Sequence, residues 1–391
     1  MIAYNSIQIC RYDMEYKKIK EINEYKSESI NPMKTPDTMY ELYSVPFFTT
    51  GHPEYLHGSE IGSSKVTVQK NDILVCKINP RINRVWVVAD ESNYQSIASS
   101  EWIVVRTAQY NPYFLSWYFR TPMFQQLMTS EVTGIGGSLT RAQPKRVVEY
   151  PVPVLSREKQ DKIVSILDRL ESIKRERKSE LDLLDSLVKA RFVEMFGSQR
   201  KSCDLSSYIH ELRSGKSLAG SEVCKNKVLK TGAATFGWFD PNQYKYLPND
   251  YQPLPEHRVE TGDLMISRMN TPNLVGACSY VFKAPEDMYY PDRLWKVIPT
   301  EKTNLIFLWQ LLWDDEVRRQ IKEKASGTSG TMHNISKARL LKVKCIDVPI
   351  EIQNQYANDV VHVVKSKVAI DHGVILIRKA LQSGYHNVWG N

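Results

Sequence analysis

Apolar residues recur every three or four positions through the run from Ser156 to Gly197, and charged residues fill most of the positions between them. This period places one apolar stripe along one side of an α-helix. The run contains neither a Pro nor an internal Gly that would end a helix early, and Gly197 is a natural stop. The pattern therefore predicts a single helix roughly 60 Å long, at about 1.5 Å per residue.

A second amphipathic run extends from about Glu351 to Trp389. Its stripe is rich in β-branched residues and the run contains Gly373, so this helix should be weak on its own. We therefore predict that it pairs antiparallel with the first helix, the simpler alternative being a lone surface helix. The residues expected to pair the helices are Ile163, Leu167, Leu170, Leu184, Leu187, Val364, Val368 and Ile377.

Short β-branched segments separated by turn residues precede the first long helix. Three of them lie within Lys65–Val88, and Glu101–Arg106 is typical of a further strand. Two helices are predicted from Pro112 onward, with a break at Pro122, and a Gly-rich loop, Thr133–Arg141, follows them. This part of the chain therefore predicts a mixed α/β domain.

Two earlier segments give weaker patterns. Asn31–Pro53 is rich in Pro, Thr and Gly, and we expect loops there. Met14–Ile22 is compatible with either a short strand or a short helix.

The second half of the chain repeats this order at a shift of roughly 191 to 196 residues. Lys70–Leu74 returns as Thr261–Met265, and Trp102 corresponds to Trp295. Such a repeat indicates two copies of one structural unit. The predicted fold class is α/β (mixed α+β), with two repeated globular domains separated by two long antiparallel, coiled-coil-like helices. The predicted boundaries are 1–155 and 198–350 for the globular domains, and 156–197 and 351–391 for the long helices.

Composition narrows the class of protein. The 391 residues, 42% of them hydrophobic, allow two to three domains with proper cores. The 52 Lys and Arg exceed the 44 Asp and Glu, and this net charge of +8 is compatible with a polyanionic partner without establishing one. The six Cys have no zinc-like or redox-like spacing, and there is neither a signal sequence nor a membrane-length apolar run. We therefore expect a cytoplasmic protein with reduced thiols and no membrane association.

Motifs for catalysis are weak. Asn111–Phe114 partly matches an amino-methyltransferase motif, but it lacks the second Pro and no Gly-rich cofactor loop precedes it, so a helix start is favoured. The acidic and basic residues of Glu176–Lys178 could belong to a nuclease, but they fall on the charged face of the predicted helix. No phosphate-binding GxxxxGK[ST] motif occurs, and the eight His lack ligand-like spacing. We therefore predict no catalytic residues, no metal site and no cofactor bound by this chain.

Polar loops recur at corresponding places in the two halves. Lys77–Arg84 combines three cations with two Asn, and Ser267–Asn273 contains one Arg and two Asn. Arg can form paired hydrogen bonds with guanine and Asn with adenine, while Lys meets phosphate. The Gly-rich loops Gly134–Arg141 and Gly327–Lys337 offer backbone N–H groups and small hydroxyls to phosphates. A single polar loop of this kind usually has no ligand, but its recurrence at corresponding places favours a shared type of ligand. Two similar recognition loops held apart by a spacer suit a DNA sequence with two separate halves.

The candidate DNA-binding residues fall into two groups. The expected base or groove contacts are Arg81, Asn83, Arg84, Arg268, Asn270 and Asn273. The expected phosphate-side contacts are Lys77, Gly136, Gly137, Ser138, Arg141, Ser329, Gly330 and Lys337.

The long-helix region also resembles a known family. The sequence VPVLSREKQDKIVSILDRLESI (Val152–Ile173), which continues into LLDSLVKARFVEMFG (Leu183–Gly197), is similar to the central conserved region of type I restriction–modification specificity (S) subunits. KINPRINRVW (Lys77–Trp86) and TGDLMISRMNTPNLVG (Thr261–Gly276) resemble segments of that family's two target recognition domains. The C-terminal helix matches the family pattern less closely than the central one.

The resemblance implies a function and a set of partners. Each target recognition domain would read one half of a bipartite double-stranded DNA site. The helix pair would dock adenine-N6 methyltransferase (M) subunits and, through them, restriction (R) subunits, with the eight residues named above for helix pairing also serving as candidates for subunit docking. S-adenosylmethionine, ATP and Mg²⁺ would then be bound by the partner subunits, and this chain would do no chemistry. The alternatives are a stand-alone DNA methyltransferase or nuclease, and a protein-interaction scaffold that reads no DNA.

Overall fold

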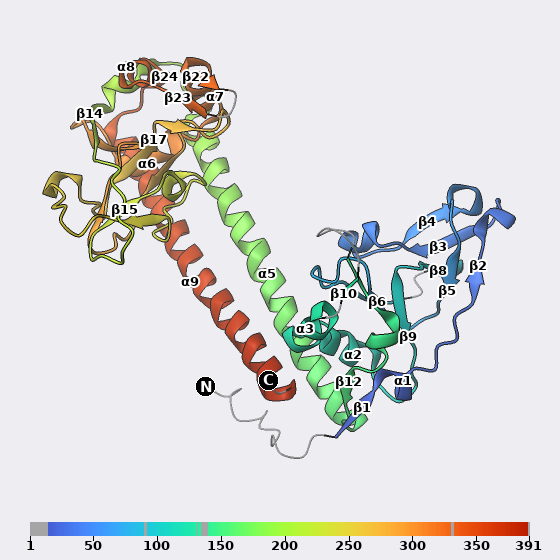
Figure 1. The fold of residues 1–391 in the computed structure, drawn as a ribbon. Helices are drawn as coiled ribbons and strands as arrows, with labels where there is room; N and C mark the ends of the chain where they lie inside the picture. The colour runs from blue at the N-terminus through green and yellow to red at the C-terminus, as the bar shows by residue number, and fades with distance from the viewer. Residues whose placement is uncertain (1–14, 90–91, 131, 134–139, 330–331, 390–391) are drawn as a thin grey trace. The chain divides into compact units, whose positions relative to one another are not determined.

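The computed structural model (Figure 1) describes residues 15–89, 92–130, 132–133, 140–329 and 332–389. The chain divides into two compact units: unit 1 contains residues 1–178 and 372–391, and unit 2 contains residues 179–371. Each long helix contributes one part to each unit, so each unit is described together with its own helical parts. No helix among the described residues is both long and apolar enough to span a bilayer.

Unit 1 is built on two sheets. The strands of the first sheet are, in spatial order, β2 (Ser29–Ile30), β5 (Lys65–Thr67), β8 (Gln95–Ser99), β3 (Met39–Tyr43) and β4 (Glu54–His57). The strands of the second are β7 (Val85–Val87), β6 (Ile73–Cys76) and β9 (Trp102–Val105). Every residue of β6 and β9 is buried, which is why both read as continuous apolar runs rather than as alternating ones.

Two short helices cover the second sheet of unit 1. Helix α2 (Pro112–Phe119) begins where Pro112 fixes the first helical residue and where the Asn111 side chain accepts hydrogen bonds from two backbone N–H groups. Helix α3 (Pro122–Ser130) follows the predicted break, and Phe114 and Phe124 pack against Ile73 and Val75 of the sheet. The remaining short elements are β1 (Tyr16–Lys18), α1 (Ile19–Ile22), η1 (Pro32–Lys34), η2 (Pro46–Thr50), η3 (Gly58–Glu60), β10 (Val132–Thr133), β11 (Arg141–Ala142), α4 (Pro144–Val147) and β12 (Pro151–Pro153).

One predicted loop is a strand. Residues 31–53 were expected to form loops, yet they contain β3, which pairs with β4 on one side and β8 on the other. The reason is Glu41, a charged residue in the middle of the strand that is fully buried because it accepts hydrogen bonds from the hydroxyls of Tyr43 and Ser92. Segment 14–22, which was compatible with either a strand or a helix, contains both, because β1 is followed directly by α1.

Unit 2 contains a four-stranded and two three-stranded sheets. The first has the order β14 (Ile209–Ser214), β21 (Leu294–Pro299), β17 (Leu264–Ser267), β19 (Cys278–Tyr280). The second sheet has the order β16 (Tyr244–Tyr246), β15 (Lys227–Leu229), β20 (Met288–Tyr289). The third has the order β18 (Met269–Asn270), β23 (Met332–Asn334), β22 (Ser326–Ser329). The further elements are β13 (Ser202–Asp204), η4 (Leu205–Ser207), η5 (Thr231–Ala234), η6 (Pro255–His257), α6 (Leu305–Leu311), α7 (Asp315–Lys324), α8 (Lys337–Leu341) and β24 (Lys344–Ile346).

The predicted repeat is present in the elements of the two units. Strands β6 and β17 each pair with the next strand of their sheet in the same register, as Val75 with Val85 and Ile266 with Cys278. Each unit then continues with two short helices, a third short helix, a short strand and a long helix. Asn111 and Asn304, 193 residues apart, both cap the first of these helices with the side chain.

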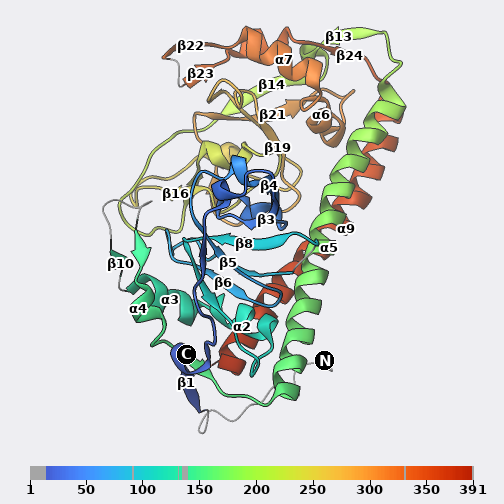
Figure 2. The same cartoon turned by 90° about the vertical axis from the view of Figure 1, so that its right-hand side faces the viewer.

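The long helices α5 (Arg157–Phe196) and α9 (Ile350–Trp389) pair antiparallel within each unit. In unit 2, Asp185 binds Lys367 and Arg191 binds Asp359 at 2.8 Å, so residue numbers rise along α5 as they fall along α9 (Figure 2). In unit 1, Leu170 of α5 and Ile377 of α9 pack against the same core. The mixed fold class with a long antiparallel helix pair is therefore confirmed.

The predicted pairing residues differ in burial. Ile163 and Leu167 are buried in the core of unit 1, and Val364 is buried in that of unit 2. Leu170, Leu184 and Ile377 are partly buried. Leu187 and Val368 remain 53% and 63% exposed, so neither side chain is buried between the helices within its unit.

Candidate nucleic-acid interface

The first candidate loop connects β6 to β7 in unit 1. Asn79 adopts a positive φ of 45°, and its carbonyl accepts a hydrogen bond from the Ile82 N–H at 3.0 Å, which closes a tight turn. Arg81 and Ile82 are exposed at the tip of this turn. The β-hairpin thus presents a cation and an apolar side chain together to solvent.

Three of the predicted contacts in this loop bind other parts of the chain. Lys77 Nζ donates to the Ser100 carbonyl at 2.7 Å, and Asn83 Nδ2 donates to the Arg120 carbonyl at 3.1 Å. Arg84 lies 3.9 Å from the thiol of Cys76. Asn83 and Arg84 are therefore partly committed to holding the loop.

The loop also pairs with the segment that follows the Gly-rich run. Asn79 N–H donates to the Thr140 carbonyl at 2.7 Å, and Ala142 N–H donates to the Lys77 carbonyl at 2.9 Å. Arg141 donates from Nε and NH2 to the Glu101 carboxylate, each at 3.1 Å, so the two side chains form an ion pair. Gly136, Gly137 and Ser138 lie outside the described residues.

Unit 2 brings its two candidate loops together in the same way. Strand β18, which contains Asn270, pairs with β23, and Arg268 Nε lies 3.5 Å from Asn334 Oδ1 of that strand. Ser329 ends β22, Gly330 lies outside the described residues, and Lys337 is exposed at the start of α8. Asn273 is exposed on the loop between β18 and β19. In both units, therefore, residues from two distant predicted loops share one surface.

A further group of cations in unit 2 was not predicted. A hollow of about 230 Å³ is lined by the exposed side chains of Lys230, Lys245 and Arg293, together with Ser217 and Thr231. These residues are spread over more than seventy positions of sequence, so no local run of charge signals them. Three cations around one hollow suit a phosphate backbone.

The candidate catalytic motifs have structural explanations. The Asn111 side chain accepts from the N–H groups of Tyr113 and Phe114 at 2.8 and 3.3 Å and donates to Asp161 at 2.7 Å, so this motif is the cap of α2, as predicted. The hydrogen bond from Asn111 lowers the pKa of Asp161. Glu176 is exposed on α5 and accepts a hydrogen bond from Ser172. Within the described residues, no three His, Cys, Asp or Glu side chains are grouped as metal ligands.

Comparison with known proteins identifies relatives. Residues 12–183 match the family described as the type I restriction modification DNA specificity domain. The specificity subunit of the type I restriction enzyme EcoKI from Escherichia coli (strain K12) is 22% identical over 200 residues. That similarity covers 46% of this chain and 43% of the E. coli protein, so the chain spans less than half the length of this curated relative.

Two solved structures share the fold. The S subunit of a type I restriction–modification system from M. genitalium has a TM-score of 0.62 and 12% identity, covering 100% of this chain and 98% of that one. A chain solved in work on complex assembly and conformational transition of the type I R-M system has a TM-score of 0.58 and 17% identity, covering 95% and 96%. The family match over residues 12–183 agrees with the resemblance found in the long-helix sequence.

Proposed function

We propose that this chain, a relative of the specificity subunits of type I restriction–modification systems, selects the DNA sequence on which such a complex acts and performs no chemistry itself. The observation that carries the proposal is the repeated pairing of two polar loops in a chain whose residues 12–183 match the DNA specificity domain. Specificity subunits of this family recognise DNA and are not catalytic, in agreement with the predicted absence of catalytic residues.

Two non-identical loop surfaces suit a bipartite double-stranded DNA target. We assign residues 1–155 and 198–350 as target recognition domains, and 156–197 and 351–391 as the spacer helices. Arg81 and Ile82 form the exposed tip in the first domain, while Asn270 and Asn273 occupy the longer loop of the second. Because these side chains differ, each domain would read a different half-site. The remaining proposed DNA contacts are Lys77, Asn83, Arg84, Gly136, Gly137, Ser138, Arg141, Arg268, Ser329, Gly330 and Lys337.

Exposed apolar residues on the long helices support docking of partner subunits. In unit 2, Leu183 and Leu187 of α5 are 67% and 53% exposed, and Val368 of α9 is 63% exposed. In unit 1, Ile375 and Leu376 of α9 are about half exposed. Leu183 and Leu187 are one helical turn apart on the same face of α5, and grouped exposed apolar side chains mark protein interfaces. We assign adenine-N6 methyltransferase subunits to these surfaces, with restriction subunits joining through them in the cytoplasm.

The cofactors of such a complex would belong to its other subunits. Methyl transfer requires S-adenosylmethionine, and DNA translocation requires ATP and Mg²⁺. We assign all three to the methyltransferase and restriction subunits.

Methylome sequencing tests this function. The chain would be expressed with its neighbouring methyltransferase subunit in a host that lacks other adenine methylation. We expect a split motif with N6-methyladenine in both halves, and its loss when this chain is omitted. The matched control is the methyltransferase subunit co-expressed with an unrelated specificity subunit, which should produce a different motif.

The alternatives give different outcomes. Methylation that persists without this chain would contradict the specificity role. Turnover of S-adenosylmethionine or cleavage of DNA by the purified chain alone would indicate an enzyme. Binding to the methyltransferase without salt-dependent binding to DNA would indicate a scaffold, because phosphate contacts release counterions.

A further inference from the structure

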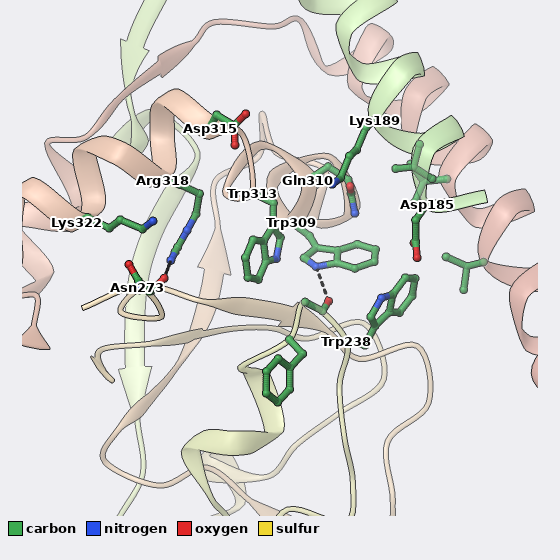
Figure 3. Close-up of a pocket in the computed structure, with 15 residues that line it drawn as sticks. Asp185, Lys189, Trp238, Asn273, Trp309, Gln310, Trp313, Asp315, Arg318 and Lys322 are labelled. Atoms are coloured by element: carbon green, nitrogen blue, oxygen red, sulfur yellow. Dashed lines mark hydrogen bonds between the residues drawn. The ribbon is translucent and has the colours of Figure 1, made fainter. Parts of the chain in front are cut away.

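A buried arginine holds the second candidate loop in unit 2. Arg318 of α7 is 6% exposed, its guanidinium lies 5.1 Å from the centre of the Trp313 ring, and its NH2 donates to the Asn273 carbonyl at 3.2 Å. Figure 3 shows Arg318 pointing from α7 toward Asn273 beside the Trp313 ring. The contact is to the backbone of the loop, so it fixes the path of the loop while Asn273 itself remains exposed.

Unit 1 makes the same contact with a different residue. Gln125 of α3 donates from Nε2 to the Pro80 carbonyl in the first loop. Gln125 and Arg318 are 193 residues apart, and so are Pro80 and Asn273. Each donor thus occupies the same position in its repeat and reaches the same position in its loop.

A second donor in each unit binds the point where the loop ends. Arg120 NH2 donates to the Val85 carbonyl at 3.0 Å, and Trp313 Nε1 donates to the Cys278 carbonyl at 3.1 Å. These pairs are again 193 residues apart. The donor side chains differ between the units, but the carbonyls that they bind correspond. We call the two bonds in each unit the loop clamp.

Burial of Arg318 is difficult to explain by packing alone. A buried guanidinium is costly unless it is paired, and among the described residues no carboxylate contributes to the electrostatic surroundings of Arg318. Its NH1 is buried without a hydrogen-bond partner, and burial lowers its pKa. An aliphatic residue of similar volume would fill this place at lower cost. The bond to Asn273 and the stacking on Trp313 are therefore the contacts that favour an arginine here.

The end of the second loop is also fitted closely to α7. Gly276 has a φ of +74°, and a Cβ added to it would lie 2.5 Å from Ile321 and 3.2 Å from Arg318 NH1. The loop therefore approaches α7 more closely than any residue with a side chain would allow. This contact and the clamp together leave the loop little freedom.

We propose that Gln125 and Arg318 are positioning residues for DNA recognition, each of which sets one loop at the height and angle needed to read one half-site. This inference rests on the proposed function. Neither side chain touches DNA in this scheme. Each acts through the loop backbone, so each controls one half of the target and not the other.

The test is methylome sequencing with the full chain and its methyltransferase subunit, for Gln125→Ala and Arg318→Met. We expect each variant to relax recognition in one half of the motif by roughly tenfold, the size expected when a base contact is displaced. The two variants should relax opposite halves. Arg318→Lys, which can still donate one hydrogen bond, should retain more discrimination than Arg318→Met.

Neighbouring residues provide matched controls. Gln126→Ala on α3 and Arg319→Met on α7 remove side chains of the same kinds from exposed positions, and both should leave the motif unchanged. Thermal unfolding of each purified complex separates positioning from stability, because a purely structural role would lower the melting temperature without making one half-site degenerate.

The outcomes separate this inference from the proposed function. An unchanged motif in Gln125→Ala and Arg318→Met would overturn the positioning role, and so would an equal loss of methylation through both halves. If Arg318→Met does not fold, Gln125→Ala and Arg318→Lys decide between these outcomes. A wild-type complex that produces no split motif would overturn the proposed function itself.

Discussion

The open end of the β6–β7 hairpin, opposite the first loop, depends on one buried carboxylate. The Asp72 side chain is 1% exposed and accepts hydrogen bonds from Arg106 Nε and NH2, both at 2.7 Å, as well as from the Gln69 N–H at 2.9 Å. Asp263 occupies the corresponding place in unit 2, where it pairs with Lys296 at 3.0 Å and accepts from the Glu260 N–H at 2.8 Å. The cation differs between the units, Arg106 in unit 1 and Lys296 in unit 2. In both units, however, an Asp side chain accepts from the backbone N–H three residues before it.

Replacement of Asp72 should destabilise unit 1. We expect Asp72→Asn to lower the free energy of unfolding by about 3 kcal/mol, because it leaves the partly buried Arg106 without its counter-charge. Urea unfolding followed by Trp fluorescence measures this. Asp37→Asn, at an exposed position, is the control and should change stability by less than about 0.5 kcal/mol. Equal stability of the two variants would contradict the importance of the buried pair.

Arg81 should affect DNA binding and not stability. We expect Arg81→Ala to weaken binding of the assembled complex to its target by about 1–3 kcal/mol, with an unchanged melting temperature. Fluorescence anisotropy with target and scrambled duplexes at several salt concentrations measures both affinity and specificity. Lys178→Ala removes the same charge from an exposed position of α5 and should have little effect. Unchanged affinity for the target in Arg81→Ala would show that the first loop is misassigned.

At the scale of elements, a glutamine joins each long helix to a short one. Gln353 of α9 is fully buried, accepts from the Asn304 N–H at 2.9 Å and donates to the Val348 and Lys302 carbonyls at 2.7 and 3.0 Å. Gln160 of α5 makes the corresponding bond to Asn111 at 2.8 Å. The start of the long helix is thus fixed to the cap of the short helix in both units.

Loss of this glutamine should loosen that junction. We expect Gln353→Ala to lower the free energy of unfolding by about 2–3 kcal/mol, since it leaves buried backbone groups without partners. Chemical denaturation followed by circular dichroism tests this. Gln355→Ala, two residues away and exposed, should be nearly neutral. A loss of similar size in both variants would assign the effect to the helix rather than to the junction.

The elements differ in how well the sequence predicts them. Helix α5 follows from its apolar period, and α2 from Asn111 and Pro112, because these signals are local. Strand β3 was missed because its central residue, Glu41, is stabilised by Ser92, which is fifty-one residues away. The loop clamp was missed for the same reason: a bond from Gln125 to the Pro80 carbonyl leaves no pattern in either segment. Long-range polar contacts of this kind become visible only in the structure.

At the scale of the whole molecule, the helix pair has buried and exposed apolar positions with different roles. Leu170 packs against the core of unit 1, whereas Leu183, on the same helix, is 67% exposed in unit 2. The apolar period alone does not distinguish buried from exposed positions, so it places Leu187 and Val368 in the same stripe as the buried Leu167 and Val364.

Substitution of Leu170 should therefore affect the stability of the protein, whereas substitution of Leu183 should affect binding of a partner subunit. We expect Leu170→Lys to lower stability by about 1–3 kcal/mol and to speed amide exchange in both α5 and α9 of unit 1. Leu183→Lys should leave stability intact but weaken capture of the methyltransferase subunit. Hydrogen exchange and a pull-down with that subunit measure the two effects. Faster exchange confined to α5 in Leu170→Lys would contradict the pairing of the helices.

The loop clamp has a consequence for how such a protein diversifies. The connection from β17 to β19 is two residues longer than that from β6 to β7, yet both are fastened at corresponding carbonyls. The two fastened carbonyls are five positions apart in both loops, so the two extra residues of the second loop precede the clamp. Insertions there, and substitutions between the fastening points, can accumulate without disturbing the scaffold. Under the proposed function, new DNA targets are therefore accessible to evolution in small steps, one half of the site at a time, while the other half continues to be recognised.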